Sequence, residues 1–512
     1  MKKKKSEVLV IGSGMAGLVF ALTCAEKYEV HLLCKGSLMD TNTALAQGGI
    51  AAALELPDSP ESHYRDTLKA GDGLCDETAV RFLVNEAAGA IRFLESKGMK
   101  FAHTPEGDYD LALEGAHSRP RVVHVHDHTG KTLMEILIQA VLRHPNIQVD
   151  EFCLVDHLIL QKGHCVGASY FRKNAKTNEL VYAAATLLAA GGAGQLYSPT
   201  TNPHLATGDG FSLAFVAGAE MQNMEFMQFH PTLLYAPGKE PFLISEALRG
   251  AGAVLCDKHG RPFMEKLHPL GSLAPRDLVS RSIFLQMKKD ESPCVFLDIR
   301  ALWSEKIASH FSSITARCRE EGIDPGKNLI PVHPAAHYMC GGIRCDLYGR
   351  SSIPGLFASG ENACTGVHGT NRLASNSLLE AVVFSRSAGQ YLLREGLPLV
   401  KTNRREPVLC LNEDPYLDLV LEHIREKLQK IMTANVGILR DPEGLQEAAS
   451  FIHSMLQNPL FNGHEHLSWK NITVKHLLTA AALVVEAAQQ RKISRGSHFI
   501  AVKKAQAPPI SR

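Results

Sequence analysis

The hydrophobic pattern at the start of the chain predicts a strand–helix–strand unit. Apolar positions favour a strand over residues 7–11, a helix over 18–27 and a second strand over 30–34. Glycines 12, 14 and 17 fall in the turn before the helix. Two later runs, 186–192 and 355–361, combine apolar residues with glycine, which is typical of buried parallel strands that end at a ligand. This part of the chain is therefore predicted to form a parallel α/β domain.

The pattern changes twice further along the chain. Residues 224–338 are mixed in character and richer in proline and histidine, so they are predicted to form a domain inserted into the first one. After residue 407 the pattern becomes helical, with amphipathic runs at 417–432 and 474–490. The predicted units are 1–223 with 339–408, the insertion 224–338, and a helical domain over 409–512.

Composition excludes several classes of function. At about 100–200 residues per domain, 512 residues allow two to four domains. Lys and Arg total 54 and Asp and Glu 53, so the net charge of +1 offers no field to bind nucleic acid or an acidic membrane surface. No apolar run reaches the roughly 18 residues that would cross a bilayer. Twelve cysteines without a CxxC pair favour buried thiols in a reducing compartment, and so a cytoplasmic enzyme.

The glycine turn predicts a dinucleotide site. Gly12, Gly14 and Gly17 follow a strand and open a helix, where the backbone can approach a pyrophosphate. The alternative is a glycine-rich turn without a ligand, and the strand–helix–strand context makes it the weaker interpretation. The acidic residue expected after the second strand is absent, and Lys35 follows that strand instead. Residues 41–52 are small, amide-rich and glycine-rich, which suits backbone N–H groups around a flat polar ring better than an ordinary surface loop.

Three alternating histidines are the best metal candidate in the sequence. His124, His126 and His128 would share one face of a strand, and three imidazoles suit zinc. A solvated or hydrogen-bonded histidine cluster is the favoured interpretation, so no metal site is predicted. The roles of His126 and His128 stay open.

Several motifs together resemble the flavoprotein family of succinate dehydrogenase, fumarate reductase and L-aspartate oxidase. They are the GxGxxG opening, AQGGIAA at 46–52, AAGG at 189–192, GDG at 208–210 and HGTNRLASNSLLE at 368–380. The resemblance spans residues 6–400 and thins across the C-terminal helices. It implies an α/β fold in which a Rossmann-like FAD-binding domain is split by an α+β capping domain and followed by an α-helical C-terminal domain.

FAD is the cofactor that the resemblance implies. In membrane-bound members a histidine just ahead of the AQGG run attaches FAD covalently, and Asn42 stands at that position here, so non-covalent FAD is expected. The implied cofactor residues, with the glycine turn included, are Gly12, Ser13, Gly14, Met15, Ala16, Gly17, Lys35, Asn42, Thr43, Ala44, Leu45, Ala46, Gln47, Gly48, Gly49, Asp209, Glu361, Ser377 and Leu378.

The resemblance also implies a substrate site. A dicarboxylate needs Arg and His donors in a pocket with little water. By resemblance His230, His337 and Arg372 bind the carboxylates and Arg276 moves a proton when fumarate is reduced. Gln228, Ser245, Glu246 and Ser375 are expected nearby. Glu114 matches a glutamate found in the L-aspartate oxidases, where it would accept N–H bonds from an α-ammonium, whereas spacing alone would favour a solvent-facing side chain.

Within the family the match is strongest to the members that oxidise L-aspartate. The expected reaction yields iminoaspartate, with reoxidation by O2, giving H2O2, or by fumarate. The resemblance implies the first step of bacterial NAD biosynthesis, with quinolinate synthase, which acts next, as a candidate functional partner. The alternative is a fumarate reductase or succinate dehydrogenase flavoprotein subunit, and a third hypothesis is a nucleotide-binding protein without redox activity. Sequence leaves the oligomeric state and the preferred electron acceptor open.

Overall fold

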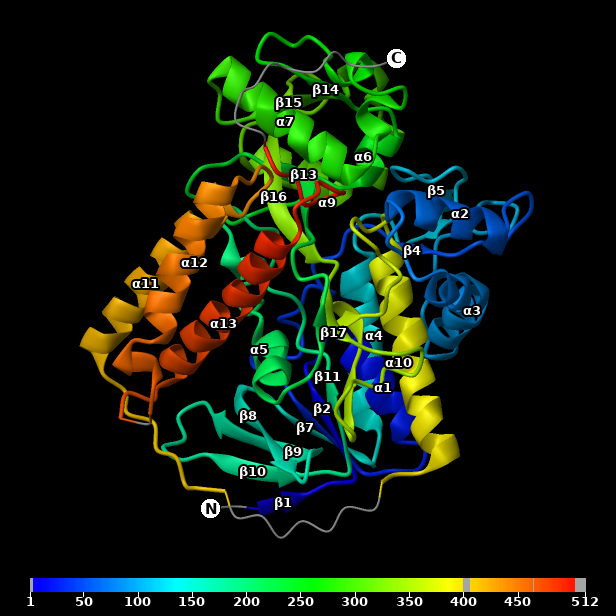
Figure 1. Ribbon diagram of the computed structural model, residues 1–512. Coiled ribbons are helices and arrows are strands. Elements are labelled where there is room, and N and C mark those ends of the chain that lie inside the picture. The colour runs from blue at the N-terminus through cyan, green and yellow to red at the C-terminus, as the bar shows by residue number, and fades with distance from the viewer. Residues whose placement is uncertain (1–2, 399–405, 464, 502–512) are drawn as a thin grey trace.

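The computed structural model describes residues 3–398, 406–463 and 465–501. Its centre is a five-stranded sheet in the order β18-β11-β2-β3-β7, and every neighbouring pair in it is parallel (Figure 1). The strands are β2 (Val8–Ile11), β3 (Val30–Leu33), β7 (Ile147–Asp150), β11 (Ala185–Leu188) and β18 (Leu356–Ala358). The strand order reverses between β2 and β11, and ligands bind at the carboxyl ends of strands at such a switch point.

The predicted strand–helix–strand unit is present with a shifted helix. Strands β2 and β3 lie where the pattern placed them, but the helix, α1, runs over Met15–Cys24 and not over 18–27. Gly14 is extended and forms the N-cap, so the helix begins directly after it and ends one turn earlier than its apolar pattern suggested. The two later glycine-marked strands are confirmed as β11 and β18, which pair with each other.

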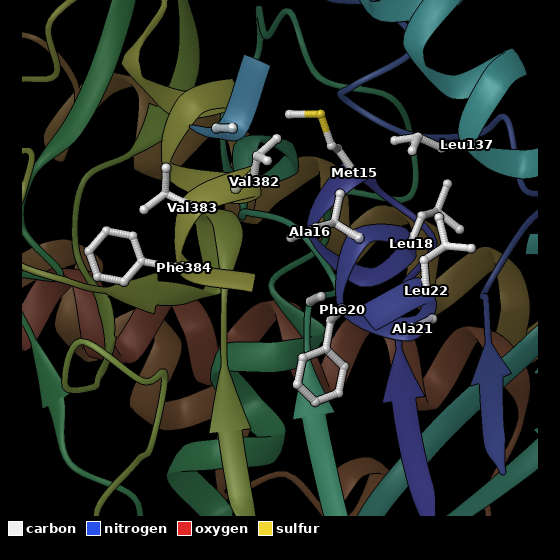
Figure 2. Close-up of a cluster of buried hydrophobic side chains, with 14 of the residues drawn as sticks. Met15, Ala16, Leu18, Phe20, Ala21, Leu22, Leu137, Val382, Val383 and Phe384 are labelled. Atoms are coloured by element: carbon white, nitrogen blue, oxygen red, sulfur yellow. The ribbon is translucent and has the colours of Figure 1, made fainter. Parts of the chain in front are cut away.

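Helix α1 is apolar on all sides because it is covered on all sides. Figure 2 shows Met15, Leu18 and Phe20 of α1 beside side chains of α10 (Asn376–Glu395) and α4 (Thr129–Arg143). Phe20 is fully buried, so truncating it to alanine would cost about 3–5 kcal/mol. This packing fixes the glycine turn that precedes α1 against the sheet.

Two smaller sheets and two helices complete this domain. The first sheet has the order β1-β10-β9-β8, formed by β1 (Lys3–Lys5), β8 (Cys153–Gln161), β9 (His164–Arg172) and β10 (Glu179–Tyr182). The second has the order β4-β6-β5, formed by β4 (Ile50–Ala51), β5 (Leu111–Ala112) and β6 (Val122–Val123). The helices α2 (Pro60–Ala70) and α3 (Glu77–Ser96) begin at Ser59 and Asp76, whose side chains accept backbone N–H bonds.

The inserted region is built on an antiparallel sheet with helices. Its strand order is β13-β16-β15-β14, with β13 (Met227–Leu234), β14 (Val254–Cys256), β15 (Val295–Asp298) and β16 (Ile330–Met339). Its helices are α6 (Glu246–Gly250), α7 (Arg276–Asp290), α8 (Glu305–His310) and α9 (Ser312–Glu320). A separate three-stranded sheet is formed by β12 (Met221–Gln222), β17 (Gly342–Arg344) and β19 (Ala363–Cys364). Strand β12 precedes the inserted sheet in the sequence, and β17 and β19 follow it.

The C-terminal part of the described chain is helical. Helices α11 (Pro415–Asn435), α12 (Pro442–Leu456) and α13 (Trp469–Gln490) lie side by side (Figure 1) and share a core with Phe211 of α5 (Asp209–Val216) and Met227 of β13. The fold class is therefore confirmed, while the domain boundaries stay predictions. Helix α13 is long and apolar enough to span a membrane, contrary to expectation, but 72% of its apolar window is buried inside the protein.

Candidate functional site

A cavity of about 330 Å³ lies at the carboxyl ends of β2, β11 and β18 and extends toward the inserted domain. Most of the predicted cofactor residues border it: Gly12, Ser13, Gly14, Met15, Ala16, Lys35, Asn42, Thr43, Leu45, Ala46, Gln47, Gly48, Gly49, Asp209, Glu361, Ser377 and Leu378. Gly17 and Ala44 do not border it. Of the predicted substrate residues only Gln228 lies outside the cavity lining.

The three glycines of the turn meet different requirements. Gly12 has φ +114°, and a Cβ there would lie 2.1 Å from the Ala189 carbonyl oxygen. A Cβ on Gly17 would lie 2.0 Å from the Gly12 oxygen, so Gly17 lets α1 pack closely against the turn. A Cβ on Gly14 would meet only Thr43 Oγ1, at 3.6 Å. Gly14 therefore leaves the helix N-terminus open to an anionic group in the cavity.

Lys35 forms a buried ion pair across the cavity wall. Its Nζ lies 2.9 Å from Asp209 Oδ2 and donates to Thr207 Oγ1 at 2.7 Å. Burial raises the pKa of Asp209, but Lys35 and His476 outweigh it and hold that pKa far below its usual value. His476 comes from α13, so the C-terminal helices contact the acid that lines the cavity. The lysine that replaces the expected acid thus neutralises an acid from another segment.

The cavity wall contains buried polar atoms that have no hydrogen-bond partner among the residues that the structure describes. Gln47 Oε1 and Arg372 Nε are buried without a hydrogen bond. Glu361 accepts from Asn42 Nδ2 at 3.1 Å and from the Met339 backbone N–H at 2.9 Å, and burial raises its pKa to about 7. Together with the open approach at Gly14, these donors and acceptors fit a flavin dinucleotide with many polar groups.

Strand irregularities place two histidines over the cavity. In the β13–β16 pair, Gln228 faces Tyr338 and Phe229 faces Ala336, which leaves His337 as the extra residue of a bulge. The rings of His230 and His337 are 5.0 Å apart. Burial and Arg276 lower the pKa of both rings far below 6.5, so both are neutral at pH 7.

The tautomer of His230 follows from its backbone partner. Its Nδ1 accepts the Thr232 backbone N–H at 3.2 Å, so Nε2 carries the ring proton and can donate it to a ligand. His337 Nδ1 lies 2.8 Å from Thr201 Oγ1.

Two arginines and a glutamate form a chain at the first turns of α6 and α7. Arg276 Nε donates to Glu246 Oε2 at 2.5 Å, and Arg249 Nη2 lies 3.3 Å from Glu246 Oε1. Despite burial, these two arginines lower the pKa of Glu246 to about 2. Gln228 accepts from Arg276 Nη1 at 3.2 Å and donates to the Arg372 carbonyl at 2.8 Å. Gln228 therefore connects the two arginines by hydrogen bonds, although it does not itself line the cavity.

The side chain of Arg372 is buried beside the cavity. Its Nη1 donates to Ser377 Oγ at 3.0 Å, and its guanidinium carbon lies 4.5 Å from the Tyr338 ring centre. Burial and the charge of Arg276 lower its pKa to about 10. Two arginines and two histidine rings that border one cavity, with the Arg372 Nε–H lacking a hydrogen bond to any described residue, are suited to bind a dianion.

Glu114 is buried, not solvent-facing. It is 4% exposed and accepts a hydrogen bond from Ser375 Oγ at 2.6 Å. Burial, followed by repulsion from Glu246, raises its pKa. A Cβ on Gly48 would lie 2.9 Å from Glu114 Oε1, so this glycine keeps the oxygen accessible. The site thus combines a cationic region, in which Glu246 is paired with Arg276 and Arg249, with a further buried carboxylate, Glu114.

The strand-face hypothesis for the three histidines is wrong. Strand β6 ends at Val123, and His124, His126 and His128 lie in the turn before α4, with His126 at φ +49°. Within residues 3–398, 406–463 and 465–501, no group of three His, Cys, Asp or Glu side chains has the geometry to hold a metal. His124 and His126 instead border a small cavity that also contacts Glu114.

Sequence reasoning missed three residues of the site. Tyr338 stacks on Arg372, Thr201 contacts His337, and Arg249 continues the chain from Glu246. A signal existed for Arg249, because a glutamate and an arginine three residues apart share one face of a helix. For Thr201 the sequence carries no such signal.

Comparisons with known proteins show which family this chain resembles in sequence and in fold. The FAD binding domain model matches residues 7–378, and the fumarate reductase flavoprotein C-term model matches 425–501. The L-aspartate oxidase of Pseudomonas aeruginosa is 40% identical over 96% of this chain and 94% of its own length. The chloroplastic L-aspartate oxidase of Arabidopsis thaliana is 41% identical over 97% of this chain and 81% of its own. A solved quinol-fumarate reductase chain superposes with a TM-score of 0.88 at 30% identity, covering 98% of this chain and 93% of its own.

Proposed function

The chain belongs to the family of FAD-binding flavoproteins that includes the L-aspartate oxidases and the fumarate reductase flavoprotein subunits, and from that premise we propose that it oxidises L-aspartate to iminoaspartate. The observation that carries the proposal is Glu114, a buried carboxylate in the lining of a cavity to which Arg276, Arg372, His230 and His337 also contribute. L-Aspartate has two carboxylates and one ammonium, which matches this arrangement of charges.

Arginine and neutral histidine donors bind the substrate carboxylates. Arg372 offers its unpaired Nε–H, and His230 offers Nε2–H from a ring that burial keeps neutral. A neutral donor costs less to bury than a charged one, so the histidines orient a carboxylate without adding to the repulsion between the arginines. When bound, FAD would supply a two-electron acceptor for the hydride that leaves Cα, and the substrate nitrogen would release one proton to water as the C=N bond forms.

Glu114 binds the α-ammonium. In its ionised form the carboxylate accepts only, and Ser375 occupies Oε2, so Oε1 beside Gly48 is free for a substrate N–H. Succinate and fumarate have no ammonium and gain nothing from this carboxylate. Glu114 therefore provides specificity for the amino acid.

A proton route for fumarate reduction is formed by Arg276, Glu246 and Arg249. In fumarate reduction Arg276 gives a proton to the substrate carbon and is reprotonated through Glu246, which contacts both arginines. The acceptors that return the enzyme to its oxidised state are O2, giving H2O2, and fumarate, giving succinate.

FAD is bound without a covalent link and the enzyme is cytoplasmic. Asn42 lines the cavity where covalent members carry histidine, and its amide donates to Glu361, so this position offers the flavin no nucleophilic nitrogen. Iminoaspartate passes to quinolinate synthase in the first steps of NAD biosynthesis.

Anaerobic flavin reduction tests the proposal. L-Aspartate added to the purified holoenzyme without oxygen should bleach the bound flavin, and succinate at the same concentration should not. A flavin that stays oxidised with L-aspartate, yet is reoxidised by fumarate after chemical reduction, would favour the fumarate reductase alternative.

A further inference from the structure

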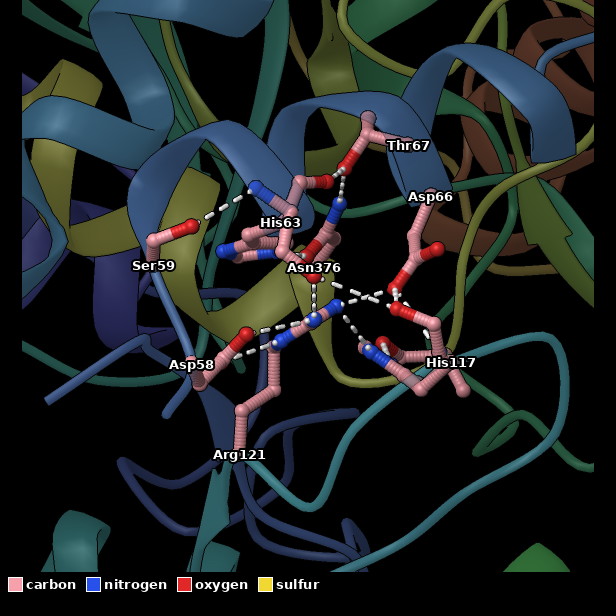
Figure 3. A network of polar contacts seen from close by, with 11 residues as sticks. Asp58, Ser59, His63, Asp66, Thr67, His117, Arg121 and Asn376 are labelled. Carbon is pink, nitrogen blue, oxygen red and sulfur yellow. Dashed lines mark hydrogen bonds and ion pairs between the residues drawn. The ribbon is translucent and has the colours of Figure 1, made fainter. Parts of the chain in front are cut away.

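A buried polar network of Asp58, Asp66, His117 and Arg121 takes no part in the proposed chemistry (Figure 3). Its centre is Arg121, which is fully buried. Arg121 donates to both Asp58 oxygens, at 2.8 and 2.9 Å, and to Asp66 Oδ2 at 2.5 Å. Two carboxylates around one guanidinium form a rigid base, because the planar fork fixes the directions of the bonds.

Arg121 determines which nitrogen of His117 carries the proton. Its Nη1 lies 3.1 Å from His117 Nδ1, and arginine can only donate. His117 Nδ1 therefore accepts, and the ring proton is on Nε2. That Nε2 donates to the Ala374 carbonyl at 3.0 Å. Burial and Arg121 lower the pKa of His117 to about 4, which keeps this single-proton state at neutral pH.

Ala374 precedes a residue with an unfavourable backbone conformation. Ser375 has φ +59°, in the left-handed region that a residue with a side chain seldom adopts. Asn376 is held on the other side, because its Oδ1 contacts His63 Nε2 at 2.8 Å and its Nδ2 donates to Thr67 Oγ1 at 3.0 Å. Hydrogen bonds to Ala374 on one side and to Asn376 on the other therefore restrain the backbone of Ser375.

The conformation of Ser375 directs its hydroxyl to Glu114. Oγ donates to Glu114 Oε2 at 2.6 Å, from a residue 261 positions away in the chain. His117 is only three residues from Glu114, and its backbone N–H donates to the Glu114 carbonyl at 3.3 Å. His117 therefore connects the segment that carries Glu114 with the segment that carries its hydrogen-bond donor.

We propose that His117, oriented by Arg121, is a positioning residue for amino-acid specificity: by fixing the Ala374 carbonyl it holds Ser375 where its hydroxyl orients Glu114 toward the substrate ammonium. The proposal rests on the proposed function. Loss of the His117 bond weakens the binding of L-aspartate, but not of a dicarboxylate without an ammonium, which does not use Glu114.

Two variants of His117 test the proposal in the holoenzyme. His117→Leu removes the donor at similar volume, and His117→Gln keeps a side-chain N–H near the place of Nε2 and serves as the matched control. We expect His117→Leu to raise the KM for L-aspartate about 10-fold, the effect of one hydrogen bond to a charged site, and to change the inhibition constant of succinate less than about 3-fold. His117→Gln should retain near-native values for both.

A double variant separates positioning from general damage. If His117 acts through Ser375, then His117→Leu added to Ser375→Ala should raise the KM for L-aspartate little beyond Ser375→Ala alone. Flavin content and thermal unfolding report folding, and His117→Met replaces the leucine variant if that does not fold. Equal loss of L-aspartate and succinate binding, or a glutamine variant as impaired as the leucine variant, would overturn the inference. Absence of L-aspartate oxidation by the native holoenzyme would overturn the proposed function instead.

Discussion

Replacing Glu114 with glutamine should separate amino-acid oxidation from dicarboxylate chemistry. The substitution keeps the shape of the side chain and an oxygen that can accept the Ser375 hydroxyl, so the contact of 2.6 Å can persist. What it removes is the negative charge that faces the substrate ammonium. The two arginines, the two histidines and the FAD site are left unchanged.

The size of the effect follows from the kind of bond that is lost. A charge-assisted hydrogen bond is about twice as strong as a neutral one, so the glutamine variant loses about 2 kcal/mol of binding to the ammonium. At 1.36 kcal/mol for each factor of ten, kcat/KM for L-aspartate should fall about 30-fold. Fumarate reduction should change less than about 3-fold, because fumarate makes no bond to Glu114.

The pH dependence has a definite sign. Burial and Glu246 raise the pKa of Glu114 above 4.5, and the ammonium needs the ionised form, so kcat/KM for L-aspartate should fall as pH decreases through that raised pKa. The glutamine variant should lack this acidic limb. A raised pKa in the folded state also means that the ionised carboxylate destabilises the protein above pH 4.5, so the variant without ligand should unfold at a higher temperature at pH 7.

Three measurements check this reasoning. Stopped-flow flavin reduction gives the L-aspartate kinetics, a reduced-dye assay gives fumarate reduction, and calorimetry gives the unfolding temperature. Equal losses with L-aspartate and fumarate, with the acidic limb retained, would refute the role of Glu114 and leave it a structural residue.

Three further outcomes are expected. Gly12→Ala should prevent folding of the FAD domain, because the added Cβ would lie 2.1 Å from a backbone oxygen. Gly14→Ala should leave the unfolding temperature of the apoprotein unchanged and weaken FAD binding, as measured by flavin fluorescence. Similar behaviour of the two variants would contradict the different roles of these glycines. Lys35→Met should destabilise the protein by about 3 kcal/mol, because buried Asp209 loses its lysine partner, and an unchanged denaturation midpoint would argue against that pair. Acid precipitation should release all the flavin into the supernatant, since Asn42 forms no covalent link; flavin left in the pellet would show otherwise.

Local pattern was sufficient for the elements of the nucleotide-binding unit. The strand over 7–11, the glycine turn and the runs at 186–192 and 355–361 are set by apolar composition and by glycines that only a tight turn tolerates, and the structure joins these strands in one parallel sheet. The apolar pattern predicted the boundaries of α1 less accurately than it predicted the strands. The reason is that the N-cap at Gly14, and not the apolar run, determines where the helix begins.

Motifs identified many of the residues that line the cavity, but not the contacts between them. The sequence indicated that Glu114 and Ser375 belong to the site, but not that one hydrogen-bonds the other or that Glu114 is buried. It also gave no indication that Arg121 orients His117. The alternating histidines show the reverse error, since a two-residue spacing was taken for a strand where the chain forms a turn.

The sequence by itself determined the parallel α/β core, the glycine turn, the helical C-terminal region and the residue types of the candidate site. Only the tertiary structure decided which of those residues meet. Helices and strands depend on neighbours within a few positions, so the sequence displays them directly. The contacts of Glu114 with Ser375, of Gln228 with Arg276 and Arg372, and of Lys35 with Asp209 depend on the order of the strands and on how the inserted domain closes over them. These contacts set burial and charge, and with them the protonation states on which the chemistry depends.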